Sequence, residues 1–345
     1  MRAVTIRSNG GPEAVLVEEV PRPVVASPDD VVVSLKAAAL NHLDLFVLRG
    51  LPGAKPSFPH VLGADGAGVV EAVGSAVTRV RVGDRVLLDP GVSCHSCEYC
   101  LAGEQSLCTT FRLLGEHLPG TFAEAVRVPQ WNAHPLPEGV AWTDAAAYPL
   151  VHLTAWRMLA TRAALRPGET VLIWGIGGGV ALAALGIAKL LGAVAVVTSS
   201  SDAKLARAQA LGADLILNHA TAEVARDVRR FTGGRGADVV VDSVGEATWE
   251  QSLRALAPGG RLVTCGATTG PKVVTDVRRM FWYHYSLLGS TMGNAREFAE
   301  ILRLLASGKL RPVVDGVTPL RDARRALERL AAGDHFGKLV LDIAA

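Results

Sequence analysis

The sequence predicts an α/β protein in which a β-rich first domain precedes a doubly wound parallel sheet. Three observations predict this fold class. The chain has 345 residues, which fits two domains better than one. From residue 169 onward, short apolar runs alternate with helical segments of about 10 to 15 residues. A glycine-rich turn directly follows the first of these runs, in a strand–turn–helix context.

Short valine-dense segments punctuated by Gly, Pro and Asp characterise the first 150 residues. Strands are expected in segments 31–39, 66–74, 83–91 and 122–129. In the second half, strands are expected at 170–174, 194–198, 214–218, 237–245, 261–266 and 285–290. One helix is expected after the glycine turn, within 175–193, and another at 201–213. Two further helices are expected to end at residue 231 and near residue 257. Two amphipathic helices (295–310 and 320–333) and a closing strand (338–343) are expected to return to the first domain.

Composition and charge exclude several classes of function. The net charge is +2, which gives no support for a nucleic-acid or membrane partner. The N-terminal residues lack a signal-peptide pattern, and glycines interrupt the most apolar segment, 171–191, so that it does not suggest a membrane span. A cytoplasmic location is therefore expected.

The glycine turn predicts a dinucleotide site. Gly177, Gly178, Gly179 and Val180 lie between a strand and a helix, so backbone N–H groups and the helix N-terminus can receive a pyrophosphate. The strict G-x-G-x-x-G spacing is not met, because Ile176 stands in place of the first glycine.

The end of the next strand bears on the choice of cofactor. Ser199 and Ser200 stand where an acid would bind the ribose 2′-hydroxyl of NAD, and Asp202 follows late enough to be a helix cap. Lys204 lies in the first helical turn, where a 2′-phosphate would compensate its charge. NADP(H) is favoured, and NAD(H) remains possible.

Four cysteines within fifteen residues predict a metal site. Cys94, Cys97, Cys100 and Cys108 have the spacing C-x2-C-x2-C-x7-C. In a reducing compartment, clustered thiols favour a metal over disulfides, and four thiolates close a tetrahedral zinc shell. A [4Fe–4S] cluster and an empty lobe are alternatives, although the fourth spacing differs from the ferredoxin run.

The chain resembles the medium-chain dehydrogenase/reductase superfamily, in particular its quinone oxidoreductase-like branch. The resemblance extends over essentially the whole chain and rests on segments 1–4, 37–50, 59–74, 153–156, 177–180, 242–245, 287–292 and 336–341, together with the cysteine lobe. It implies an N-terminal GroES-like β domain, a Rossmann domain and an active site between them. The implied bounds are 1–152 with 292–345 for the GroES-like catalytic domain, and 153–291 for the Rossmann domain.

The same resemblance implies that a catalytic zinc has been lost and that one structural zinc per chain remains. Asn41, Ala64 and Leu150 stand where zinc alcohol dehydrogenases have ligands, and Ala and Leu cannot ligate zinc. Asn41 and Asp44 match the N-x-x-D pattern of zinc-free quinone and enoyl reductases.

Site residues follow from these comparisons. Expected catalytic residues are Asn41 as a hydrogen-bond donor to a carbonyl oxygen, His42 as a proton donor, Asp44 as an orienting group, and His152. Further cofactor-binding residues are expected at Thr154, Val244, Gly245, Cys265, Gly266, Ser290 and Lys338. Phe46, Leu51, Phe58 and segment 281–284 are expected to line an apolar substrate wall.

The leading hypothesis is an NADPH-dependent reductase of quinones or α,β-unsaturated carbonyls. An alcohol dehydrogenase or carbonyl reductase, and a non-catalytic NADPH-binding sensor or interaction protein, are the alternatives. The resemblance implies a homodimer or homotetramer.

Overall fold

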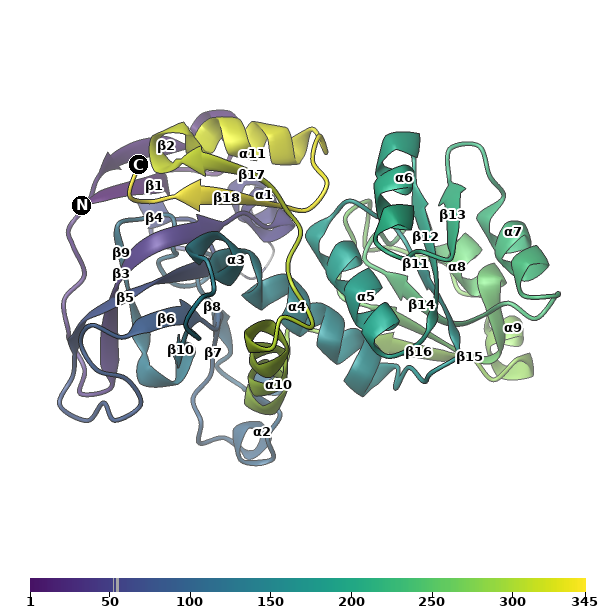
Figure 1. Ribbon diagram of the computed structural model, residues 1–345, viewed down its shortest axis with the longest axis horizontal. Coiled ribbons are helices and arrows are strands. Elements are labelled where there is room, and N and C mark those ends of the chain that lie inside the picture. The colour runs from purple at the N-terminus through teal and green to yellow at the C-terminus, as the bar shows by residue number, and fades with distance from the viewer. Residues whose placement is uncertain (52, 54–55) are drawn as a thin grey trace. The chain divides into compact units, whose positions relative to one another are not determined.

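The computed structural model describes residues 1–51, 53 and 56–345, and the described chain divides into two compact units. Unit 1 comprises Met1–Leu150, Asn294–Phe298 and Pro312–Ala345. Unit 2 comprises Val151–Gly293 and Ala299–Arg311. Both chain termini lie in unit 1, as Figure 1 shows.

Unit 1 is built on a mixed seven-stranded sheet with the order β10-β6-β5-β3-β18-β17, in which β9 also pairs with β3. Its strands are β3 (Asp30–Ala39), β5 (Asp65–Val73), β6 (Arg85–Leu88), β9 (Ala125–Pro129), β10 (Ala133–Pro135), β17 (Val314–Pro319) and β18 (Lys338–Asp342). Smaller sheets contain β1 (Arg2–Ile6), β2 (Leu16–Glu19) and β4 (His60–Val61), and β7 (Gly91–Val92) with β8 (Arg112–Leu113). Its helices are α1 (His42–Arg49), α2 (Glu98–Leu101), α3 (Trp142–Ala147) and α11 (Ala323–Ala331).

The central strand β3 fixes the geometry of unit 1. It runs antiparallel to both β5 and β18, and Ala39 lies opposite Asp65 on one side and Val340 on the other. The end of β3 therefore lies beside the beginnings of β5 and β18. Figure 1 shows the C-terminal strand β18 next to β3, with β17 on its other side, although some 300 residues separate β3 from β18 along the chain.

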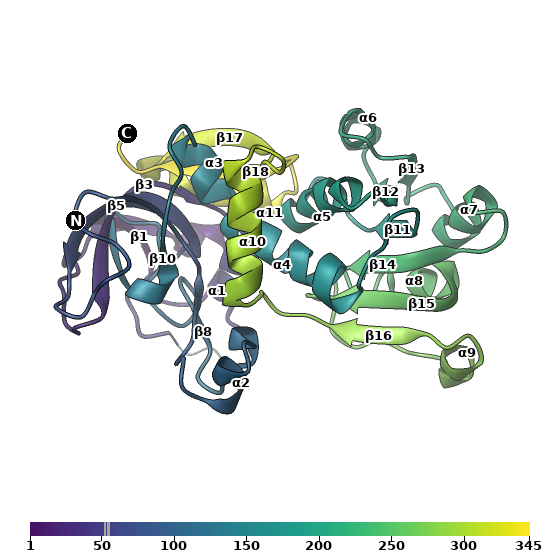
Figure 2. The same cartoon turned by 60° about the horizontal axis from the view of Figure 1, so that its bottom comes forward.

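Unit 2 contains an all-parallel six-stranded sheet with the order β13-β12-β11-β14-β15-β16. Its strands are β11 (Thr170–Ile173), β12 (Val194–Ser199), β13 (Leu215–Asn218), β14 (Ala237–Asp242), β15 (Leu256–Thr264) and β16 (Ser286–Gly289). Its helices are α5 (Gly179–Leu190), α6 (Asp202–Ala210), α7 (Val224–Phe231), α8 (Trp249–Ala255) and α9 (Val277–Trp282). Helices α4 (Pro149–Trp156) and α10 (Ala295–Ala306) have residues in both units. Figure 2 shows β16 as the outermost strand of the sheet, with α9 beyond it.

The α/β fold class is confirmed. The chain first adds β12 and β13 on one side of β11 and then β14, β15 and β16 on its other side. This change of side at β11 is the switch point of a doubly wound sheet. Strands β11 and β14 are buried along their whole length, which explains why each contains an uninterrupted apolar run, 171–173 and 239–241, rather than alternating residues.

Three local features differ from the expectations. Strand β15 begins at Leu256, because the Ala-Pro-Gly-Gly segment is accommodated by a register shift against β14 rather than by a separate turn. The sequence analysis did not identify β17. Residues 299–311, which were expected in the first domain, group with unit 2, where Leu310 packs closely against Gly186 of α5.

Among the described residues, no helix combines the length and the apolar character needed to cross a membrane.

Candidate active site

A buried polar cluster in unit 1 joins Asn41, Asp65 and Lys338. The Lys338 Nζ atom donates to Asn41 Oδ1 and, at 3.1 Å, to Asp65 Oδ2, while Asn41 Nδ2 donates to Asp65 Oδ2 at 2.9 Å. The three residues are 5%, 0% and 4% exposed, respectively. Asn41 follows the end of β3, and Asp65 and Lys338 begin β5 and β18, so the antiparallel pairing brings the three side chains together.

The amide of Asn41 is fully used within this cluster. Its Oδ1 must face Lys338, because an ammonium can only donate, and its Nδ2 then bonds to Asp65 and, more weakly, to the Ala39 carbonyl at 3.4 Å. Both N–H groups of the amide have acceptors, so the expected role of Asn41 as a hydrogen-bond donor to substrate is not supported.

Asp65 organises the cluster, and the sequence analysis did not include it among the site residues. Besides binding Asn41 and Lys338, its Oδ1 accepts from the Leu150 backbone N–H at 2.9 Å, and its own carbonyl accepts from Thr121 Oγ1 at 2.7 Å. The sequence feature that could have identified Asp65 is its position between Ala64 and Gly66, at the beginning of a mostly apolar strand.

The three positions expected to have lost a catalytic zinc converge on this carboxylate. Asn41 binds Asp65 through its side chain, Leu150 binds it through its backbone N–H, and Ala64 is its buried chain neighbour. Their side chains offer no thiolate or imidazole, so they do not fit a catalytic zinc. Within the described ranges, the four-cysteine cluster is the single group of three or more His, Cys, Asp or Glu residues with metal-binding geometry.

Asp44 supports the position of Asn41. Its Oδ2 accepts from the Asn41 backbone N–H at 2.7 Å, at the start of α1. Burial raises the pKa of the Asp44 carboxyl to about 7, which the Asn41 hydrogen bond and the Lys338 charge partly oppose. This arrangement is compatible with the orienting role expected for Asp44.

The two histidines lie in different surroundings. His42 is the first residue of α1, its side chain reaches solvent, and its ring packs edge-on against Phe46 with centroids 5.9 Å apart. Nearby protein atoms that exclude water, and to a smaller extent Arg49, lower the pKa of its imidazole. His152 is a buried residue of α4 and belongs to unit 2.

The four cysteines form a compact site in unit 1. Their Sγ atoms all lie within 4.8 Å of one another, a separation that suits ligands around one tetrahedral zinc. Backbone N–H groups point at the sulfurs, including Cys97 N to Cys94 Sγ and Cys94 N to Cys108 Sγ, both at 3.3 Å. Four thiolates would complete the zinc shell and leave no position for a substrate.

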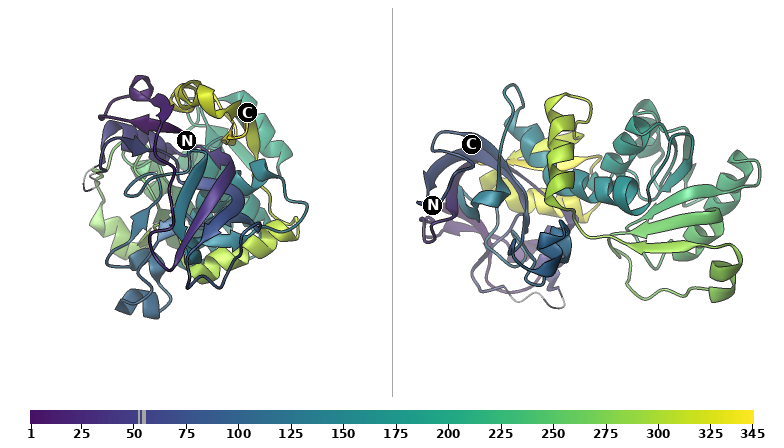
Figure 3. Two further views of the ribbon diagram at one scale, coloured as in Figure 1. Left: turned by 90° about the vertical axis from the view of Figure 1, so that its left-hand side faces the viewer. Right: turned by 90° about the horizontal axis from the view of Figure 1, so that it is seen from below.

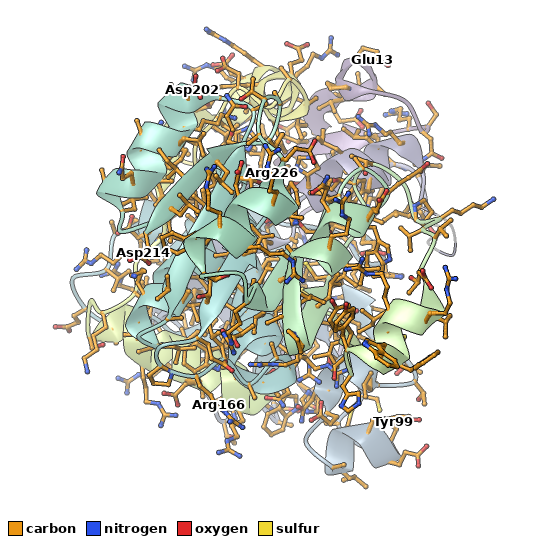
Figure 4. The ribbon with its side chains drawn as sticks, turned by 90° about the vertical axis from the view of Figure 1, so that its right-hand side faces the viewer. Glu13, Tyr99, Arg166, Asp202, Asp214 and Arg226 are labelled. Carbon is orange, nitrogen blue, oxygen red and sulfur yellow. The ribbon has the colours of Figure 1, made fainter. Side chains whose placement is uncertain are left out.

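Without a bound metal, the thiols of this site differ in their pKa values. A backbone N–H of Ser96 contributes most to lowering the pKa of Cys94 to about 5, whereas burial raises that of Cys100 to about 12. The lobe lies at the margin of unit 1, where Figure 3 shows α2 projecting from the strands and Figure 4 shows Tyr99 of α2 at the surface.

In unit 2, the glycine turn lies at the carboxyl end of β11, where the strand order reverses. Gly175 and Gly177 have φ values of 69° and 120°, which favour glycine, and Gly178 caps the N-terminus of α5. A Cβ built on Gly178 would meet no atom nearer than 3.7 Å, so the backbone there is accessible to a ligand. These features fit the pyrophosphate of a dinucleotide.

The other residues expected to bind the cofactor in unit 2 come from neighbouring strand ends and from α4. Ser199 ends β12, Val244 and Gly245 follow β14, Cys265 and Gly266 follow β15, and Ser290 follows β16. Ser200 follows Ser199, and Thr154 lies in α4, where its Oγ1 is 3.8 Å from Met292 Sδ. Lys338 belongs to unit 1, where it binds Asn41 and Asp65, and its expected contact with the cofactor stays a prediction.

Two buried polar atoms at strand ends are unpaired among the described residues. They are Trp174 Nε1, directly after β11, and Ser290 Oγ, directly after β16. Such atoms in a native structure call for a ligand or water, and their place at the carboxyl end of the sheet fits a cofactor. Burial raises the pKa of the Cys265 thiol to about 12, so this cysteine is a poor nucleophile at neutral pH.

The loop after β14 is held by Asp242, which belongs to the segment 242–245 noted in the sequence analysis but was not expected as a site residue. Its buried carboxylate accepts from the N–H groups of Val244 and Gly245 at 2.9 and 3.0 Å, and from the hydroxyls of Thr248 and Ser252. These bonds fix the backbone at two of the expected cofactor-binding positions.

The surroundings of the expected 2′-phosphate position are polar. Ser201 caps α6 and accepts from the Lys204 backbone N–H at 3.4 Å. Asp202, on the first turn of α6 in Figure 4, accepts from Asn218 Nδ2 at 2.7 Å. Asp202 therefore already has a partner in the protein.

Comparison with known proteins places both units in known families. Residues 27–138 match the alcohol dehydrogenase GroES-like domain, and residues 179–307 match the zinc-binding dehydrogenase family. The chain is 33% identical to a quinone oxidoreductase of Pseudomonas aeruginosa, over 99% of both proteins. It is also 33% identical to the acryloyl-coenzyme A reductase of Metallosphaera sedula, again over 99% of both. A solved structure described as an NAD-dependent alcohol dehydrogenase has 46% identity and a TM-score of 0.95, with 99% of this chain and 100% of that chain covered.

Proposed function

The chain belongs to the medium-chain dehydrogenase/reductase superfamily and is an NAD(P)-dependent oxidoreductase, and from this premise we propose that it reduces quinones or α,β-unsaturated carbonyls without a catalytic zinc. When bound, the reduced nicotinamide supplies the hydride. The proposed substrates are small apolar molecules with a carbonyl group conjugated to the C=C bond that is reduced.

The observation that carries this proposal is the chemistry of the side chains at residues 41, 64 and 150, where the resemblance implies zinc ligands in alcohol dehydrogenases. Three residues, Asn41, Ala64 and Leu150, lie around the buried Lys338–Asp65 pair. Their side chains provide no thiolate or imidazole to hold a zinc ion as a Lewis acid. Polarising a simple alcohol for hydride loss is harder without a metal. A conjugated alkene accepts hydride at its β-carbon, and its oxygen then needs only hydrogen-bond donors.

An alcohol dehydrogenase or carbonyl reductase is the second candidate. It is favoured by the solved structure with 46% identity, whose description is an NAD-dependent alcohol dehydrogenase. A non-catalytic NADPH-binding sensor is the third alternative.

We propose NADPH as the preferred cofactor. Lys204 lies in the first turn of α6, after the serines that end β12, and Asp202 is engaged by Asn218. The description of the 46%-identical structure favours NADH instead. Replacement of Lys204 by Ala should raise KM for NADPH about tenfold and leave KM for NADH unchanged, as expected for loss of a hydrogen bond to a charged group.

Steady-state kinetics test the reaction class. The purified protein would be assayed with NADPH against 2-cyclohexenone and 1,4-benzoquinone, and with NADP+ against ethanol and 2-propanol. We expect kcat/KM for the best conjugated acceptor to exceed that for the best alcohol by about tenfold or more, which equals ~1.4 kcal/mol in activation free energy. Faster oxidation of alcohols would favour the second candidate, and cofactor binding without turnover on any compound would favour the third.

A further inference from the structure

Lys338 is the one cation in the polar cluster around Asp65, within the described part of the chain. Its Nζ atom has two protein partners, Asn41 Oδ1 and Asp65 Oδ2. An ammonium has three N–H donors, so one is left over. The side chain is 4% exposed, and a buried donor without an acceptor is costly.

Asn41 could also donate a hydrogen bond to a substrate, but its amide group already has partners within the protein. Its Nδ2 hydrogens bond to Asp65 and to the Ala39 carbonyl, and its Oδ1 accepts from Lys338. Asn41 and Asp65 together hold the Lys338 ammonium from two sides. Such a clamp positions a charge without consuming all its donors.

The position of this charge is informative. The resemblance to zinc alcohol dehydrogenases implies that residues 41, 64 and 150 stand at the positions of their catalytic metal ligands. In this chain Asn41 and Leu150 bind Asp65, and Ala64 directly precedes it. A positive charge therefore remains at this place, supplied by a side chain in place of an ion.

We propose that Lys338 is a catalytic residue whose third N–H binds the carbonyl oxygen of the substrate and stabilises the negative charge that develops there, while Asn41 and Asp65 position the ammonium. This inference rests on the proposed function for its substrate class. Hydride adds to the β-carbon, and the C=C electron pair moves toward the carbonyl oxygen to give an enolate. A reduced nicotinamide, when bound, would supply this hydride and its two electrons. A proton from water then adds to the α-carbon. Lys338 keeps its proton and lowers the energy of the enolate, because charge-assisted hydrogen bonds are roughly twice as strong as neutral ones.

The decisive experiment measures the apparent pKa of a bound phenol, whose phenolate form mimics the enolate oxygen. It does not depend on enzyme turnover. In the presence of oxidised cofactor, 4-nitrophenol would be titrated spectroscopically while bound to the full-length protein. We expect the wild-type protein to lower the apparent pKa of the bound phenol by about one unit or more, since an adjacent cation favours the phenolate. Lys338→Met should abolish this shift, and Lys309→Met, which removes an exposed lysine, should preserve it.

A second variant separates the proposed role from a structural one. Lys338→Met leaves Asp65 buried without its cation and can unfold the protein, whereas Asp65→Asn/Lys338→Met removes both charges and keeps a polar group for Asn41 and Leu150. The double variant should fold, lack the probe shift and lose about 100-fold or more in kcat on the best acceptor of the wild-type enzyme. The absence of a probe shift in the wild type, or an equal shift in the double variant, would overturn the proposal. Failure of the proposed reaction would appear separately, as wild-type turnover of aldehydes or alcohols but not of enones or quinones.

Discussion

The Lys338 ammonium and the Asp65 carboxylate are 3.1 Å apart, and both side chains are almost completely buried. The pair joins the first residue of β18 to the first residue of β5, across the end of β3 that lies between them. It therefore links the C-terminal segment of the chain to the N-terminal half of unit 1.

Breaking this pair from one side should be strongly destabilising. Asp65→Leu leaves a buried ammonium without its counter-charge and the Leu150 N–H without its acceptor, and we expect a loss of about 3–5 kcal/mol in the free energy of unfolding. Urea denaturation followed by circular dichroism measures this loss. Asp65→Leu/Lys338→Met should regain much of it. Glu300→Ala, which removes an exposed ion pair with Arg303, is the control and should change stability by less than about 1 kcal/mol.

The titration of Asp44 predicts a pH-dependent effect on stability. Its pKa is raised from 3.8 to about 7 in the folded protein, mainly by burial. The folded state therefore binds more protons than the unfolded state between these values, and the wild type loses stability as the pH rises through this window. Asp44→Asn keeps an oxygen to accept from the Asn41 N–H and has no charge to bury.

We expect Asp44→Asn to gain stability relative to wild type between pH 4.5 and pH 8, by on the order of 1–3 kcal/mol. Urea titrations at these two pH values measure the difference, and Asp322→Asn, at an exposed aspartate, should show no such change. The same stability difference at both pH values would show that burial does not raise the pKa of Asp44.

Metal analysis should find one zinc per chain. Cys108→Ser removes one of the four ligands, and we expect it to lose the zinc and to unfold at a lower temperature. Hydride-transfer activity per folded molecule should change by less than about threefold, because the cysteine lobe is not part of the Asn41–Asp65–Lys338 cluster. Cys265→Ser is the matched control and should keep the metal. A second tightly bound zinc, or activity proportional to zinc content, would contradict the loss of the catalytic metal.

The sequence predicted elements where local signals were strong. The strand–glycine–helix order around Gly178 and the cysteine spacing are both local patterns, and the structure contains the corresponding turn and cluster. The contacts of Lys338 with Asn41 and Asp65 were not predicted, because the sequence around Lys338 gives no information on its spatial neighbours. Its contact with Asn41 spans 297 residues and depends on β18 pairing with β3, which no local pattern specifies. The network around Asp242 and the shifted start of β15 likewise result from tertiary pairing.

The exposed edge of unit 2 predicts how two copies associate. Strand β16 ends the sheet, and the neighbouring helix α9 exposes Val277, Phe281 and Trp282 by 65%, 62% and 74%. An open strand edge beside exposed apolar side chains is typical of an interface. We expect the wild-type protein to sediment as a dimer or tetramer of the 36.2 kDa chain, and Phe281→Glu/Trp282→Glu to shift it to the monomer. Val24→Glu, at an equally exposed valine of unit 1, should leave the assembly intact. If the double variant keeps its assembly but raises KM for the acceptor, the aromatic run lines the substrate site, as the sequence analysis expected, and does not form the interface.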